Sequence, residues 1–288
     1  MKLKKIIFTS LLILTWTHAS AVAPGETRWH NESVDTIKIL NLLDASARSG
    51  AIDANGRAAA AAHAMLGTPY VAGTLEASPE MLTINTEEVD CTTFLDLVLA
   101  VAKTAGESRQ SWHDVAHNLE NMRYRNGRVD GYASRLHYIS DWVIDNTQRG
   151  NIREVTADLP GASYEIKTLD FMSSHRDSYP ALADENVFER LKNTEIGYRS
   201  HRFPLVKSNR ISKATIAALR EGDAVALTSK LPGLDVSHVG FITFVDGVPH
   251  LLHASTTAGK VIVDSRPLTE YLRRARNVTG IRVFRLRE

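Results

Sequence analysis

The only cysteine of this chain, Cys91, is the residue whose type and position most strongly suggest chemistry. A lone cysteine can form no disulfide within its own chain, although it can also pack as a small hydrophobic residue. Cys91 follows Asp90 and opens an apolar stretch to Ala102, which predicts a central, buried helix ending near Gly106. Unpaired backbone amides at a helix start favour the nucleophilic thiolate. Asp90 opposes that ionisation unless its carboxylate caps the helix.

Two histidines in the C-terminal part are the candidate partners of Cys91. His238 opens an apolar strand, and His253 lies on the next strand beyond the hairpin signal Asp246-Gly247. One imidazole can take the thiol proton while the second orients the first, as in a catalytic triad. Side chains on paired strands can reach each other, so we expect His238 and His253 to meet. Taken singly, either histidine is also explained as a surface or core residue.

His250 is the rival for the orienting position. It follows Pro249 close to the hairpin turn, so we expect it to be exposed and prefer His253. Paired histidine or cysteine motifs at metal-ligand spacing are not found, and we expect neither a metal nor a cofactor.

The elements that must position these residues predict an α+β fold. Helical spacing marks residues 34–43 and 57–65 before the cysteine helix, and residues 82–84 form an extended piece. The C-terminal part turns to strands, at residues 224–227, 238–245, 249–253, 261–263 and 281–286. We therefore expect N-terminal helices, with the cysteine helix central, packed on a mostly antiparallel sheet.

A long stretch separates the cysteine from the histidine strands. We expect helices within Trp112 to Arg125, Tyr132 to Trp142 and Phe188 to Arg202, without a readable topology. We treat residues 107–210 as an insertion in a single domain, residues 22–288.

The N-terminal residues and the net charge limit where this protein can act and what it can bind. Three lysines among the first five residues precede an apolar run to Trp16 and the small residues Ala19-Ser20-Ala21, which predicts a signal peptide over residues 1–21. The run is short for a membrane anchor. We expect an exported protein, periplasmic or secreted, and monomeric. The formal net charge of +1 offers no global field for binding nucleic acid.

Taken in order, these motifs resemble the NlpC-type cell-wall hydrolases of the papain-like superfamily, and within them the N-acetylmuramoyl-L-alanine amidase-like branch. The segments that carry the resemblance are Gly67-Thr68-Pro69-Tyr70, Asp90-Cys91-Thr92-Thr93-Phe94, Gly222-Asp223-Ala224-Val225, Ser237-His238-Val239-Gly240 and Leu252-His253-Ala254. Thr92-Thr93-Phe94 and the long insertion depart from the commoner endopeptidase branch and resemble the amidase-like one, as does the segment Tyr132–Trp142.

The resemblance implies that Cys91 attacks an amide carbonyl, that His238 relays the proton and that His253 orients His238. Tyr70 would help the backbone amide of Cys91 to hold the oxyanion, since a phenol donates to developing negative charge. Tyr70 can equally be a packed aromatic residue near a proline turn.

Four further residues are predicted to contact the substrate: Thr92, Ser237, Arg135 and Tyr138. An arginine among aromatic residues can hold a sugar-peptide, because rings stack on sugars and guanidinium pairs with carboxylate. Arg135 and Tyr138 also fit a helix with a buried aromatic stripe.

The expected reaction is hydrolysis of the amide between N-acetylmuramic acid and L-alanine through a thioester, on soluble peptidoglycan fragments that include anhydro forms. Three alternatives stay open: a D-glutamyl-diaminopimelate endopeptidase of the same superfamily, a non-catalytic wall-binding module, and a thioesterase or acyltransferase with the same dyad.

Overall fold

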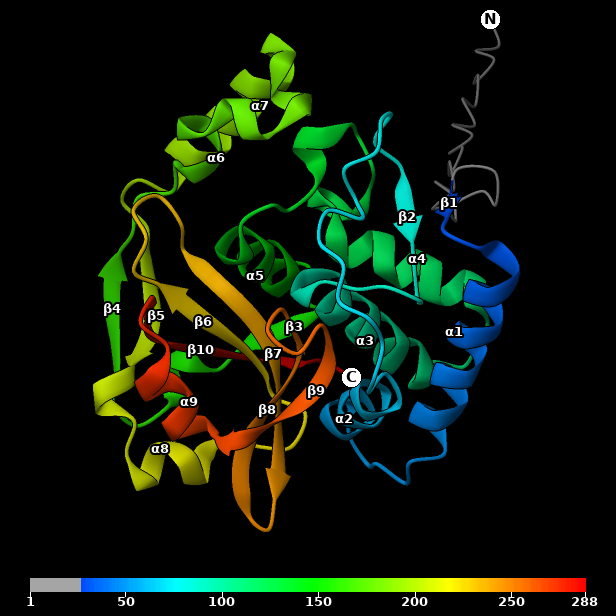
Figure 1. Ribbon diagram of the computed structural model, residues 1–288, viewed down its shortest axis with the longest axis vertical. Helices are drawn as coiled ribbons and strands as arrows, with labels where there is room; N and C mark the ends of the chain where they lie inside the picture. The colour runs from blue at the N-terminus through cyan, green and yellow to red at the C-terminus, as the bar shows by residue number, and fades with distance from the viewer. Residues whose placement is uncertain (1–26) are drawn as a thin grey trace, which may run out of the picture.

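The computed structural model describes residues 27–288, and Figure 1 shows how their helices and strands are arranged. The signal peptide predicted over residues 1–21 lies outside the described residues. The helices are α1 (Glu32–Ala47), α2 (Ala54–Ala64), α3 (Cys91–Ala105), α4 (Trp112–Arg123), α5 (Ile139–Gln148), α6 (Phe171–Ser174), α7 (Glu185–Gly197), α8 (Lys213–Ala218) and α9 (Leu268–Arg274). The strands are β1 (Thr27–Trp29), β2 (Leu82–Ile84), β3 (Ile152–Glu154), β4 (Ala162–Ile166), β5 (Arg202–Lys207), β6 (Ala224–Ser229), β7 (Val236–Val245), β8 (Val248–Ser255), β9 (Lys260–Pro267) and β10 (Val278–Leu286).

The larger sheet is antiparallel at every pairing. Its strands run in the order β4-β5-β10-β6-β7-β8-β9, and β3 also pairs with β10. Asp246 and Gly247 join β7 to β8 with φ angles of 51° and 76°, the positive values that a tight hairpin turn needs. Helices and an antiparallel sheet confirm the α+β prediction.

Helix α3 begins at Cys91 because Asp90 caps it. The Asp90 carboxylate accepts hydrogen bonds from the backbone amides of Thr92 and Thr93 at 3.0 and 2.7 Å, and the Thr93 hydroxyl accepts one from the Asp90 amide at 2.8 Å. This reciprocal pair is a capping box. The side chains from residue 93 to residue 102 are all buried, so the predicted central helix is confirmed.

Helices cover both faces of the sheet (Figure 1). On one face, α2, α3 and α5 pack against the sheet, and α1 and α4 pack against α3 in the same apolar cluster. The ring of Phe94 in α3 meets that of Phe241 in β7 edge to face, with the ring centroids 5.6 Å apart. Burying one phenylalanine contributes about 2 kcal/mol, so this pair holds the start of α3 against β7. On the other face, α8 and α9 cover a second apolar cluster.

The segment from residue 107 to residue 210 adds β3, β4 and β5 to the sheet as well as α4 to α7. Two of its helices differ from the expectation. The one predicted from Tyr132 begins only at Ile139, because the buried Arg135 just before it pairs with Glu76 at 2.9 Å, far away in sequence. The one predicted over residues 188–202 ends at Gly197, and Arg202 begins an edge-side strand instead.

Candidate active site

Cys91 is the first residue of α3, and its side chain is half-buried. Burial and, second to it, the neighbouring Asp90 carboxylate raise the pKa of the thiol to about 11, against a smaller lowering by the backbone of Val239. The helix start therefore does not yield the resting thiolate that the sequence suggested, because desolvation and Asp90 outweigh the backbone dipoles. The cysteine rests as a neutral thiol.

His238 and His253 meet across the strands β7 and β8. Nε2 of His238 lies 2.6 Å from Nδ1 of His253, and the two rings are perpendicular, with centroids 4.8 Å apart and an interplanar angle of 87°. This geometry is a hydrogen bond between imidazoles. It leaves Nδ1 of His238 as the ring nitrogen that can serve a substrate or a nucleophile.

Two backbone features allow the histidines to approach. A β-bulge in β7 around Ser237 shifts its register against β6 immediately before His238, and bulges commonly re-aim side chains at functional sites. Gly240 lies against β8, where a Cβ atom would stand 2.7 Å from the carbonyl oxygen of Leu252 and 2.9 Å from the Cβ of His253. Glycine is therefore required for this close pairing.

Both imidazoles are held neutral. Burial lowers the pKa of His238 to about 3, with His253 as the second cause, and burial lowers the pKa of His253 to about 4. A neutral His238 can accept a proton, which a general base must do.

One cavity of about 500 Å³ brings the candidate residues together. Its lining includes Cys91, His238, His253, Tyr70 and Ser237. Within residues 27–288, the Cys91 sulfur has no hydrogen bond to His238, and its hydrogen-bonding neighbour is the hydroxyl of Thr92 at 4.0 Å. Thiol and imidazole therefore face a common space without being joined.

Tyr70 is half-buried at the edge of this cavity, on a segment that bridges to Val89 just before the cysteine helix. Burial, with smaller contributions from Cys91 and Asp90, raises its pKa to about 12. The phenol therefore keeps its proton across the physiological range and can donate it in a hydrogen bond.

The predicted substrate-binding residues separate into two groups. Ser237 is exposed and lines the cavity, and Thr92 is next to Cys91. Arg135 and Tyr138 do not line it. Arg135 is buried between Glu76 and Glu80, and the buried Tyr138 hydroxyl donates to Glu195 at 2.6 Å.

Three ionisable cavity residues were missed by the sequence reasoning: Asp264, Arg266 and Tyr271. An acid and a base two positions apart on one strand share a face of the sheet, and this was the available signal for Asp264 and Arg266 of β9. His250 was expected to be exposed, but it is buried, and its Nδ1 lies 2.8 Å from the backbone oxygen of Asp264. His250 lies on the buried face of β8, which explains why the expectation of exposure was wrong.

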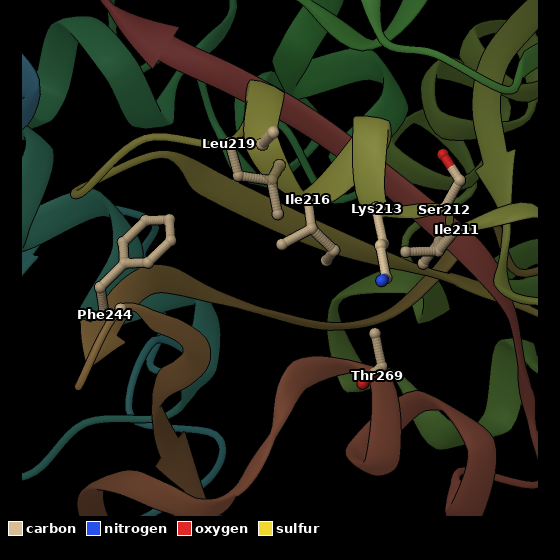
Figure 2. Close-up of a pocket in the computed structure, with 9 residues that line it drawn as sticks. Ile211, Ser212, Lys213, Ile216, Leu219, Phe244 and Thr269 are labelled. Carbon is tan, nitrogen blue, oxygen red and sulfur yellow. The ribbon is translucent and has the colours of Figure 1, made fainter.

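A second cavity, of about 470 Å³, lies between α8, α9 and the end of β7 (Figure 2). Figure 2 shows Ile216, Leu219 and Phe244 along it, with Lys213 as its charged side chain. The residues that line it include no thiol, imidazole or carboxylate.

The described residues hold neither a membrane-spanning helix nor a cluster of metal ligands. No helix among them has the length and apolar character that a bilayer crossing requires. No group of three or more histidine, cysteine or acidic side chains within residues 27–288 is arranged to hold a metal ion.

Comparison with known proteins identifies the family. The model of the AmiA-like family, described as N-acetylmuramoyl-L-alanine amidase-like, matches residues 60–281. A crystal structure of an N-acetylmuramoyl-L-alanine amidase from Bacteroides uniformis is 37% identical, with a TM-score of 0.77, and the match covers 82% of this chain and 99% of that one. The chain therefore belongs to the N-acetylmuramoyl-L-alanine amidase-like family.

Two further structures are similar. A Bacteroides fragilis protein, provisionally described as a xylanase, is 38% identical with a TM-score of 0.73, over 78% of this chain and 99% of that one. A Legionella pneumophila protein shares the fold at 20% identity, with a TM-score of 0.66, over 89% of this chain and 96% of that one. No curated protein sequence matches the chain.

Proposed function

We propose that this protein is a cysteine amidase of the papain-like, NlpC-type superfamily that hydrolyses the amide between N-acetylmuramic acid and L-alanine in peptidoglycan fragments. The observation that carries the proposal is the cavity shared by Cys91, His238, His253 and Tyr70, in a member of the amidase-like family. A thiol, a neutral base and an orienting group are the parts that acyl transfer needs.

The proposed reaction begins with attack of the Cys91 sulfur on the lactyl carbonyl, while the thiol proton passes to Nδ1 of His238. Because the thiol pKa is raised to about 11 and that of His238 lowered to about 3, proton transfer accompanies attack rather than preceding it. The backbone amide of Cys91 and the Tyr70 hydroxyl donate to the oxyanion. His238 then protonates the leaving amine, and water releases the sugar acid from the thioester.

A glycosidase is the function that the xylanase description of one similar structure raises. Glycoside hydrolysis normally needs two carboxylates on either side of the bond. Among the described residues that line the cavity, Asp264 is the one carboxylate, and it is paired with Arg266 at 2.6 Å. The site therefore favours acyl transfer over glycoside cleavage.

The substrate class that we propose is soluble muropeptides, anhydro forms included, rather than the intact sacculus. The protein would act outside the cytoplasm as a monomer, after removal of residues 1–21. Amino-terminal sequencing of the protein from its native host tests the cleavage, and a mature chain that still begins at Met1 would contradict it.

The experiment is mass spectrometry of defined muropeptides after incubation with the protein and with Cys91→Ala. Free stem peptide and a peptide-free sugar, both missing with Cys91→Ala, are the expected products. A sugar that keeps a dipeptide would move the cut into the stem and identify an endopeptidase. Binding without turnover would favour a wall-binding module.

A further inference from the structure

The second nitrogen of His253 has an unusual environment. Nδ1 is taken by His238, and Nε2 is buried without a hydrogen-bond partner. The nearest ion-pairing group is the Asp264 carboxylate, whose Oδ2 lies 3.9 Å from Nε2, and both side chains are more than nine-tenths buried. A buried polar atom without a partner is disfavoured, so this nitrogen indicates an interaction that tightens in another state of the site.

The proposed function determines which ring nitrogens of His238 and His253 carry protons. If Nδ1 of His238 receives the thiol proton, Nε2 of His238 must carry the hydrogen that it shares with His253. Nδ1 of His253 then accepts, which leaves the proton of neutral His253 on Nε2. That N–H faces the side on which Asp264 lies.

Asp264 is held as an anion at this position. Arg266 donates to its carboxylate from Nε at 2.8 Å, from Nη2 at 2.6 Å and from the backbone amide at 2.9 Å. These hydrogen bonds hold the pKa of Asp264 below its usual range. The groups that face His253 are therefore His238 of β7, Asp264 and Arg266 of β9, and Tyr271 of α9, whose ring lies 5.7 Å away.

We propose that Asp264 is a positioning residue that acts through His253 and completes the series Cys91, His238, His253, Asp264. The inference rests on the proposed function of the first two residues. Asp264 selects the tautomer of His253 with its proton on Nε2, which leaves Nδ1 free to accept from His238. No proton passes to Asp264. The thiol proton stops on His238, and the carboxylate stabilises the resulting positive charge.

A purely structural role is the competing explanation, in which Asp264 serves only to anchor Arg266. The chain offers a matched pair for this comparison. Asp223 is also buried and is also held by an arginine, with Arg285 donating at 2.7 and 3.0 Å, but it does not line the Cys91 cavity. Its carboxylate also accepts from Asn55 and from the backbone amide of Arg220, so Asp223→Asn reports the effect of disturbing a buried, arginine-held carboxylate away from the cavity.

The first test measures alkylation of Cys91 by iodoacetamide from pH 5 to pH 10, together with the thermal midpoint, in the full chain and in both variants. Asp264→Asn should slow alkylation near pH 7 by about tenfold, the scale of losing an orienting partner of a histidine. Asp223→Asn should lower the thermal midpoint and keep the wild-type alkylation profile. An unchanged profile in Asp264→Asn would overturn the proposal.

The second test needs no variant. Nitrogen-15 spectra of the histidine side chains in the wild-type protein should show His253 as the neutral form protonated on Nε2, and the form protonated on Nδ1 would overturn the proposal. Neither test uses substrate, so failure of the amidase assay would not be confused with failure of this inference.

Discussion

His238 and His253 are joined by a hydrogen bond of 2.6 Å between Nε2 of the first and Nδ1 of the second. The contact is possible because Gly240 brings β8 close to β7, and it leaves Nδ1 of His238 as the ring nitrogen outside this hydrogen bond. The chemistry that we propose for the site therefore depends on the pairing of two strands as much as on the cysteine.

Removing the orienting ring tests this relationship directly. His253→Ala should lower kcat about a hundredfold and leave KM nearly unchanged, because the tautomer of His238 is no longer selected. His253→Gln should keep more activity, since its amide oxygen can still accept from Nε2. His117→Gln, exposed on α4, is the control and should behave as wild type. Equal activity of the alanine and glutamine variants would argue against an orienting role.

Gly240→Ala should separate the two histidines. Its Cβ would stand 2.7 Å from a backbone oxygen of β8, so the strand must move, at about 1–3 kcal/mol of stability. Gly197→Ala is the matched control, because a Cβ added there would meet nothing within 4 Å and the φ of Gly197 is not positive. Urea unfolding and muropeptide turnover measure the two effects. A Gly240→Ala protein with wild-type stability and turnover would contradict the packing argument.

Asp90→Asn should make the thiol more acidic. Asparagine caps a helix about as well as aspartate, so stability should change by less than about 1 kcal/mol. Removal of the anion should bring the Cys91 pKa below about 11, and the rise of iodoacetamide alkylation with pH should move to lower pH. Asp184→Asn changes the equivalent cap of α7 and should leave that profile in place. A shift toward higher pH would refute the assigned role of Asp90.

Tyr70→Phe removes a hydrogen-bond donor from the proposed oxyanion site. Loss of one such donor lowers kcat by about a hundredfold or more, and KM should change little. Tyr164→Phe, on an exposed position of β4, provides the control. Full turnover by Tyr70→Phe would show that Tyr70 is a packing residue.

Acid should destabilise the fold through its buried histidines. The pKa values of His238 and His253 fall from 6.5 to about 3 and about 4, so the unfolded chain binds protons before the folded one does. Their contribution to stability is therefore complete above about pH 6.5 and is lost as the pH falls toward 3. Urea midpoints at pH 7.5 and pH 4.5 measure the loss, which should shrink in a His238→Gln, His253→Gln double variant. If the double variant loses as much stability between pH 7.5 and pH 4.5 as the wild type, groups other than these two histidines cause the acid sensitivity.

The sequence by itself determined the local elements of the site. The apolar run after Asp90-Cys91 predicted the buried helix with cysteine in its first turn, and alternation around Asp246-Gly247 predicted the histidine hairpin. Both signals are short-range, since periodicity and turn chemistry act within a few residues.

Only the tertiary structure decided which polar residues face the cavity. It buried Arg135 between acids that lie more than fifty residues away, and it brought Asp264, Arg266 and Tyr271 to the histidines. It also reversed the expected acidity of Cys91, because desolvation depends on everything packed around the thiol. These outcomes follow from long-range packing, which a local pattern does not encode.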